Sequence, residues 1–174
     1  LGLDLGFKIL KKFNFKANVG ASAYTSNITS VGDFGLSNEI PILQTLSSVF
    51  TYNLTSKLQM AGEASINYKI KNFGTGIEYK RISPGYQTLG TYYFQEDFQN
   101  ITLKMNISTP KNKVRFNGSG GIQTNNLNGL RESTRSRKII NTTLMLSPWK
   151  TFNTTIRVAN FQSDRTPSFN RIND

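Results

Sequence analysis

The sequence has no cysteine and no histidine, and it has only 10 acidic residues against 21 lysines and arginines. The absence of cysteine excludes disulfides, thiolate metal ligands and cysteine nucleophiles within these residues. The absence of histidine excludes Ser-His-Asp triads, the HExxH metalloprotease motif and most zinc sites. We therefore predict that this segment is not an enzyme and that it binds no cofactor and no metal.

Long hydrophobic runs are also missing, since no stretch approaches the ~18 consecutive apolar residues of a transmembrane helix. A signal peptide is not expected, because residues 1–4 already alternate like a strand and no basic segment precedes them. Residues 168–174 contain no terminating element. Both ends therefore predict a segment of a longer polypeptide.

The sequence does contain a strong alternation with a period of two. In residues 13–23 the odd positions are Phe, Ala or Val, and the even positions are polar or glycine. Residues 49–70 repeat the pattern over a longer stretch. An amphipathic helix would instead repeat its apolar positions every three or four residues. The pattern predicts an all-β fold of eight strands, at residues 2–10, 13–25, 49–70, 73–82, 99–108, 113–125, 138–147 and 152–161.

The connections between these strands are predicted to alternate in length. The short ones are residues 11–12, 71–72, 109–112 and 148–151, and the long ones are residues 26–48, 83–99 and 126–137. In an antiparallel up-and-down meander, this order places every tight turn at one end and every long loop at the other.

Long two-faced strands with segregated turns and loops are typical of a transmembrane β-barrel in a Gram-negative outer membrane. The short turns would be periplasmic and the long loops extracellular, and the sheet would close because lipid tolerates no open edge. The alternative is a soluble, lipocalin-like β-barrel that carries an apolar ligand. Strands of soluble proteins are typically ~5–6 residues long, which favours the membrane barrel.

The polar side of the strands is rich in cations. The alternation places nine basic residues on the face predicted to line the lumen: Lys8, Lys16, Lys57, Lys69, Lys80, Lys104, Lys113, Arg115 and Arg157. Only Asp4, Glu63 and Glu78 oppose them, and the two glutamates are interpreted as counter-ions of Lys69 and Lys80. The narrow interior of an eight-stranded barrel requires its buried charges to pair. The excess of cations therefore predicts part of a larger barrel.

Two predicted loops carry side chains that could contact other molecules. One holds the extracellular-loop aromatics Tyr86, Tyr92, Tyr93 and Phe94, which predict either a self-packed loop or a binding surface. The other holds four basic residues that could contact lipopolysaccharide phosphates or remain solvated: Arg131, Arg135, Arg137 and Lys138. Because the basic residues of the chain form no compact patch, we predict no nucleic-acid binding.

Several stretches carry a resemblance to a protein family. They are residues 78–90, 92–94, 97–103, 118–123, 125–127 and 160–162. These stretches resemble large, mostly uncharacterised outer-membrane β-barrel proteins of Bacteroidota, and the likeness spans approximately residues 3–162. It implies a protein several times longer, in which this segment forms part of the barrel wall.

The predicted function is that of a pore wall or scaffold in a transport, secretion or envelope-assembly complex. The predicted partners are outer-membrane lipid, possible lipopolysaccharide and other envelope proteins. An enzyme whose catalytic residues lie elsewhere in a longer chain is a further alternative, which this segment neither supports nor excludes.

Overall fold

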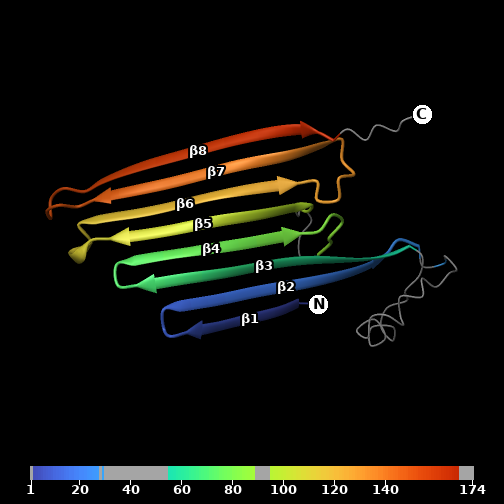
Figure 1. Cartoon of the computed structure of the whole chain (residues 1–174), viewed down its shortest axis with the longest axis horizontal. Coiled ribbons are helices and arrows are strands. Elements are labelled where there is room, and N and C mark those ends of the chain that lie inside the picture. Colours follow the sequence, from blue (N-terminus) through green and yellow to red (C-terminus); the bar gives the residue numbers. More distant parts are fainter. Residues whose placement is uncertain (1, 28, 30–54, 89–94, 169–174) are drawn as a thin grey trace.

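The computed structural model describes residues 2–27, 29, 55–88 and 95–168. They form one eight-stranded antiparallel sheet in which each strand pairs with its neighbours in the chain, in the order β1 to β8 (Figure 1). The strands are β1 (Gly2–Ile9), β2 (Phe13–Thr25), β3 (Ser56–Ile70), β4 (Phe73–Ile82), β5 (Phe98–Ser108), β6 (Val114–Asn125), β7 (Ser133–Leu146) and β8 (Thr154–Pro167). The all-β, up-and-down meander predicted from the alternation is confirmed. No helix in the described part of the chain is long and apolar enough to span a bilayer.

The strand ends differ from the predicted ranges mainly in the last two strands. β7 begins at Ser133 and β8 continues to Pro167, so both strands extend into stretches predicted to be loop or tail. These extensions are polar on both faces, which removes the alternation from the sequence while the backbone ladder continues. Residues 49–54 of the predicted third strand lie outside the described residues.

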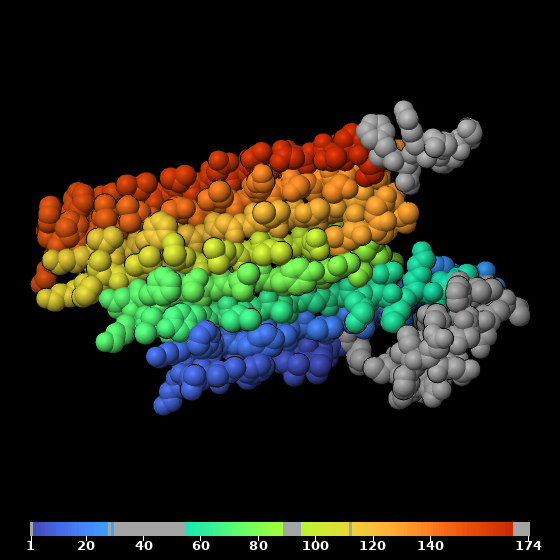
Figure 2. Space-filling view, viewed as in Figure 1, coloured from blue at the N-terminus to red at the C-terminus, as the bar shows by residue number. Residues whose placement is uncertain are grey.

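Among the described residues the sheet does not close on itself. β1 pairs only with β2, and β8 pairs only with β7. The sheet is therefore an open wall with two free edges, and Figure 2 shows its strands side by side with no second layer over the visible face.

The register sorts the side chains of β1 to β7 onto two chemically different faces. One line of paired positions runs Phe7, Phe15, Ile66, Ile77, Leu103, Gly120 and Ile140. The adjacent line runs Lys8, Asn14, Asn67, Gly76, Lys104, Ser119 and Asn141. We call the first the apolar face and the second the polar face. A shift of one residue between any two strands would exchange the faces, so the alternation itself specifies this register.

The apolar face is the more open of the two, as β4 shows. On this strand the apolar-face residues Ile77 and Tyr79 are 49% and 38% exposed. Their polar-face neighbours Glu78 and Lys80 are half-buried, and Gly76 is buried. Side chains converge on the concave side of a curved sheet and spread on its convex side. Over β3 to β5, where this difference holds, the exposures therefore indicate that the polar face is concave and the apolar face convex.

Two glycines allow close packing on the polar face. A Cβ atom at Gly76 would collide with Asn67 Oδ1, and a Cβ atom at Gly121 would lie 2.9 Å from Thr102 Oγ1. At Gly120, the next residue and on the apolar face, a Cβ atom would meet nothing within 4 Å. Glycine is thus required where side chains of neighbouring strands cross the concave face.

The short turns lie together at one end of the sheet, as predicted (Figure 1). The first three contain a lysine with positive φ: Lys11 (55°), Lys71 (36°) and Lys111 (64°). The predicted difference in length is not strict, because the β7–β8 turn at residues 147–153 is no shorter than the β6–β7 connection at residues 126–132. The reason is the early start of β7, which shortens the loop predicted at 126–137.

The sheet has almost no core of its own. In the described part of the chain, the only buried large hydrophobic residues are Ile82 and Phe98, which pair across the loop ends of β4 and β5. Asp97 and Asn126 are the buried polar residues beside them. A single sheet with an open apolar face needs a further apolar partner to be stable.

Candidate functional site

The polar face is the candidate functional surface, because it gathers most of the predicted basic residues. Eight of the nine lie on strands with their register positions on this face: Lys8, Lys16, Lys57, Lys69, Lys80, Lys104, Arg115 and Arg157. Lys113 lies in the turn before β6, with helical backbone angles of φ −64° and ψ −32°. Asp4, Glu63 and Glu78 lie on the same face.

Two ion pairs cross the polar face between neighbouring strands. Lys80 Nζ lies 3.7 Å from Glu63 Oε2, and Lys104 Nζ lies 2.6 Å from Glu78 Oε2. The pairing of Glu63 with Lys80 agrees with the sequence interpretation. Glu78 pairs with Lys104, which faces it diagonally from β5, and not with Lys69. Both pairs are exposed enough that each contributes at most about 1 kcal/mol.

The charges on this face are unevenly distributed. All three carboxylates belong to β1, β3 and β4. In the described strands β5 to β8, the polar face carries cations, amides, hydroxyls and a few apolar side chains such as Ile139 and Phe161, but no Asp or Glu. One half of the concave surface therefore has mixed charge and the other half is purely cationic, so the field near the second half attracts anions.

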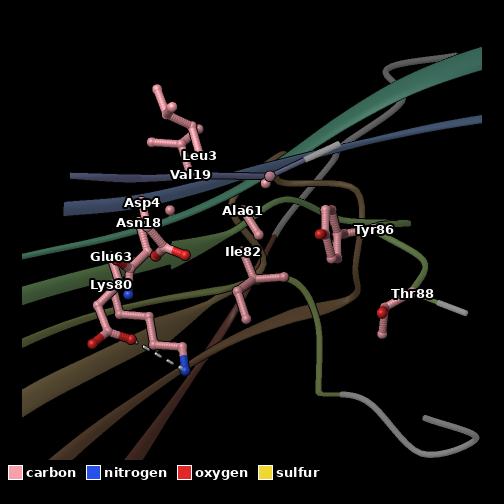
Figure 3. Close-up of a pocket in the computed structure, with 13 residues that line it drawn as sticks. Leu3, Asp4, Asn18, Val19, Ala61, Glu63, Lys80, Ile82, Tyr86 and Thr88 are labelled. Carbon is pink, nitrogen blue, oxygen red and sulfur yellow. Dashed lines mark ion pairs between the residues drawn. The ribbon is translucent and has the colours of Figure 1, made fainter. Parts of the chain in front are cut away.

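A shallow hollow of about 400 Å³ lies at the loop end of β1 to β4 (Figure 3). Its floor forms where the small residues Gly2, Gly20 and Ala61 line up across three strands. Tyr86 and Thr88, from the connection after β4, stand at one side. The small floor residues create the depression, because no large side chain fills the space above them.

The polar groups of the hollow are already engaged with one another. Figure 3 shows Asp4, Asn18 and Glu63 on the side of the sheet opposite Leu3 and Val19. With its amide oriented to donate, Asn18 Nδ2 lies 2.6 Å from Asp4 Oδ1. Glu63 is paired with Lys80. These carboxylates are held by partners, and the hollow offers hydrogen bonds to a polar solute.

One of the four predicted loop cations belongs to a buried cluster at the loop end of β5 to β8. Asp97 is 1% exposed, its Oδ1 accepts a hydrogen bond from Leu127 N (2.8 Å), and Arg131 Nε lies 2.6 Å from its Oδ2 as an ion pair. The side chain of Asn126 bonds to Arg131 N and O, Thr134 Oγ1 and Ser168 Oγ. Asp97 and Asn126 both have positive φ, which aspartate and asparagine tolerate better than most residues. We call this cluster the loop latch. The sequence reasoning placed Arg131 in an open basic loop and missed both buried partners.

The other three loop cations are divided between the faces. Arg135 and Arg137 lie on the polar face of β7, whereas Lys138 lies in line with the apolar-face residue Ile122. Arg135 stands directly opposite Arg165 of β8, which lies beyond the predicted end of the last strand at residue 161. Arg165 Nε donates to Ser133 Oγ at 2.7 Å. The structure thus brings Arg135, Arg137 and Arg165 together and separates them from Arg131 and Lys138.

Of the predicted aromatic loop residues, only Tyr86 lies in the described part of the chain. It contributes to the hollow, and its backbone N–H donates to Ser83 O at 3.2 Å. Tyr92, Tyr93 and Phe94 lie outside the described residues.

Comparison with protein-family models, with curated proteins and with solved structures finds no match to this chain. The resemblance to outer-membrane barrels of Bacteroidota therefore stays a prediction, and the two faces of the sheet are the structural features that bear on function.

Proposed function

We propose that this segment forms part of the wall of an outer-membrane β-barrel with more than eight strands. Its convex apolar face contacts lipid, and its concave polar face lines the lumen. It serves as a pore wall or scaffold in a transport, secretion or envelope-assembly complex. It acts by holding a closed, hydrogen-bonded wall and a cation-rich lumen, without catalysis.

The observation that carries this proposal is the combination of curvature and polarity. A membrane barrel needs apolar residues on the convex side, whereas a soluble carrier of the lipocalin type needs them on the concave side. Here the large apolar side chains are the open ones: Ile77, Ile101, Leu103, Ile122 and Ile140 are each 49–57% exposed. This arrangement favours lipid over an internal apolar cavity.

The outline of the apolar face gives a second argument. Its border at the turn end moves from Phe13 on β2 to Leu146 on β7, and its border at the loop end, taken over the described residues, moves from Leu58 on β3 to Val158 on β8. Followed through the register, the turn-end border shifts by four residues and the loop-end border by ten residues, each over five steps between neighbouring strands. With the usual rise per residue and spacing between strands, these shifts correspond to strands tilted by roughly 30–55° to the band. Strands of membrane barrels tilt by about 35–45° to the barrel axis, so a flat lipid layer would produce this oblique band.

Aromatic residues mark the turn-side border of the band. Phe13 and Tyr68 pack across β2 and β3 with ring centroids 4.7 Å apart, and Phe73 and Phe116 continue the row on β4 and β6. Trp149 and Phe152 pack 5.5 Å apart in the last turn. Girdles of aromatic residues are typical of the two interfaces of membrane barrels.

The proposal extends to the neighbours of the segment. The free edges of β1 and β8 in the described sheet require further strands, because a bilayer leaves no backbone group without a partner. The unpaired cations of the polar face also require room for water or acidic partners. Both needs are met in a wider barrel.

Single-cysteine labelling tests the proposal directly, since the sequence has no cysteine of its own. Ile140→Cys and Asn141→Cys place a fluorophore on the apolar and the polar face of β7, one residue apart. In native membranes, we expect a lipid-bound nitroxide to quench the label at 140 and aqueous iodide to quench the label at 141.

A soluble carrier would give a different result. The protein would then be absent from the membrane fraction, and a lipid-bound quencher would reach neither label. Equal quenching of both labels by iodide would also overturn the proposal. The mass of the native polypeptide provides a further test, because a mass near that of 174 residues would exclude a barrel of more than eight strands.

A further inference from the structure

In the described part of the chain, every charged side chain at the turn end of the sheet is a cation. The short turns contain six lysines: Lys11, Lys12, Lys71, Lys111, Lys113 and Lys150. Lys8, Lys69, Arg115 and Arg157 lie on the adjacent strand ends. We call these ten residues the turn rim. No described carboxylate lies closer to the turns than Glu63 and Glu78, and both are paired with lysines of the strand interior.

The two ends of the sheet differ in their proportions of lysine and arginine. Eight of the ten turn-rim residues are lysines, whereas the loop end carries Arg81, Arg131, Arg135, Arg137 and Arg165 together with Lys57. Arginine suits fixed, bidentate contacts, and lysine is a flexible, strongly hydrated point charge. A rim composed mainly of lysine therefore fits a fluid anionic surface better than a single shaped ligand.

Exposed apolar side chains are interleaved with these lysines. Leu10 is 81% exposed beside Lys11 and Lys12, and Trp149 is 64% exposed beside Lys150. Trp at the level of lipid headgroups, with lysine stems lying along apolar surface and their ammonium groups in water, is the usual composition of a membrane interface. The cores of protein–protein interfaces are instead depleted of lysine.

From these observations we propose that the turn rim binds the headgroups of anionic phospholipids in the leaflet at the turn end. The inference rests on the proposed function, and it adds the lipid class that this end of the wall selects. The ammonium groups contact headgroup phosphates, while Leu10 and Trp149 enter the headgroup–acyl boundary. Attraction to an anionic leaflet falls off within a Debye length, so only cations at this end contribute.

Trp149 provides the probe, because it is the one tryptophan of the sequence and lies in the rim. The native protein is reconstituted with phosphatidylcholine and phosphatidylglycerol, and only one of the two lipids carries brominated acyl chains. Subtracting the signal of Trp149→Phe isolates the fluorescence of this residue. We expect stronger quenching by brominated phosphatidylglycerol, and we expect high salt to remove the difference.

A triple variant, Lys71→Gln with Lys111→Gln and Lys150→Gln, tests the role of the rim. Each lysine near an anionic surface favours the anionic lipid by about fivefold, so the preference should fall steeply. The matched control is Arg135→Gln with Arg137→Gln and Arg165→Gln at the loop end, which should leave the preference unchanged.

The possible outcomes separate the two proposals. Quenching by both lipids without an anionic preference, or a preference that survives in the triple variant, would overturn the rim proposal and leave the membrane wall intact. No quenching of Trp149 by either lipid, together with no lipid contact at position 140, would overturn the membrane wall itself. An anionic preference that the loop-end control also removes would show a diffuse charge effect and overturn a specific role of the rim.

Discussion

Replacing Leu103 by arginine should distinguish a lipid-facing surface from a water-facing one. Leu103 lies on the apolar face of β5, is 57% exposed, and has Ile77 opposite it on β4. If this face meets lipid, an arginine near the middle of the band costs about 2–4 kcal/mol. If the face meets water, less than half of a leucine side chain is buried, and the loss is about 1 kcal/mol or less.

The adjacent position supplies the control for this experiment. Thr102 lies on the polar face, in line with Glu78, so Thr102→Arg adds a cation where water and a carboxylate are near. We expect Thr102→Arg to cost about 1 kcal/mol or less. The assay is reversible unfolding of the protein in lipid vesicles by guanidinium chloride, followed by tryptophan fluorescence.

A depth series strengthens the same test. The penalty for arginine should be largest at Leu103 and Met105 and fall to about 0–1 kcal/mol at Ile107, near the turn-side border. Equal penalties at Leu103 and Thr102 would refute the assignment of the two faces. A penalty that does not decline towards Ile107 would indicate a packed protein interior in place of lipid.

Three further predictions concern the polar face and the loop latch. Gly121→Ala should destabilise the protein by about 1–3 kcal/mol, because the added methyl group would lie 2.9 Å from a hydroxyl of β5, whereas Gly120→Ala should be neutral or slightly stabilising. Asp97→Ala should cost about 1–3 kcal/mol and speed cleavage by trypsin at residues 126–132, because a half-buried N–H and a guanidinium lose their acceptor. Lys57→Glu combined with Arg115→Glu should shift the ion selectivity of the reconstituted protein towards cations.

Each of these predictions has an outcome that contradicts it. Equal effects of alanine at positions 120 and 121, measured by denaturant unfolding, would mean that the concave face can accommodate a methyl group at position 121 without a steric clash. Unchanged trypsin cleavage in Asp97→Ala would show that the loop latch does not hold the connection, with Glu132→Gln as the exposed control. Unaltered selectivity in planar bilayers, or no conductance at all, would leave the scaffold role and exclude a conducting lumen.

The sequence was informative wherever one face of a strand is apolar. The bounds of β2 and β4 agree with the predicted ranges, because apolar side chains alternate over most of each strand, from Phe13 to Ala23 on β2 and at Phe73, Ile77 and Tyr79 on β4. The ends of β7 and β8 were missed, since residues such as Thr134 and Asp164 leave no apolar face to detect. Whether the sheet closes was likewise beyond the sequence, because pairing of the outermost strands leaves no mark in the alternation.

The sequence likewise predicted some residues of the candidate site and missed others. The alternation within each strand placed Lys16, Lys69 and Lys104 on the face opposite the apolar side chains, because successive residues of a strand point to opposite faces. The partner of Arg131 could not be predicted, since Asp97 lies 34 positions earlier and meets it only through the order of the strands. A signal did exist at Asn126, because asparagine directly after a strand is typical of a left-handed turn residue.

The free edges of β1 and β8 have a consequence for how the protein is made. Each edge of the described sheet presents a row of backbone donors and acceptors, and many large apolar side chains lie exposed on one side of the sheet. Such an edge pairs readily with a second copy of itself, which is the first step of strand-mediated aggregation. In the proposed barrel, the newly synthesised chain must therefore be kept apart from other copies until its neighbouring strands are in place. Produced alone in water, this segment should accumulate as an insoluble deposit, and detergent or lipid present during refolding should recover it.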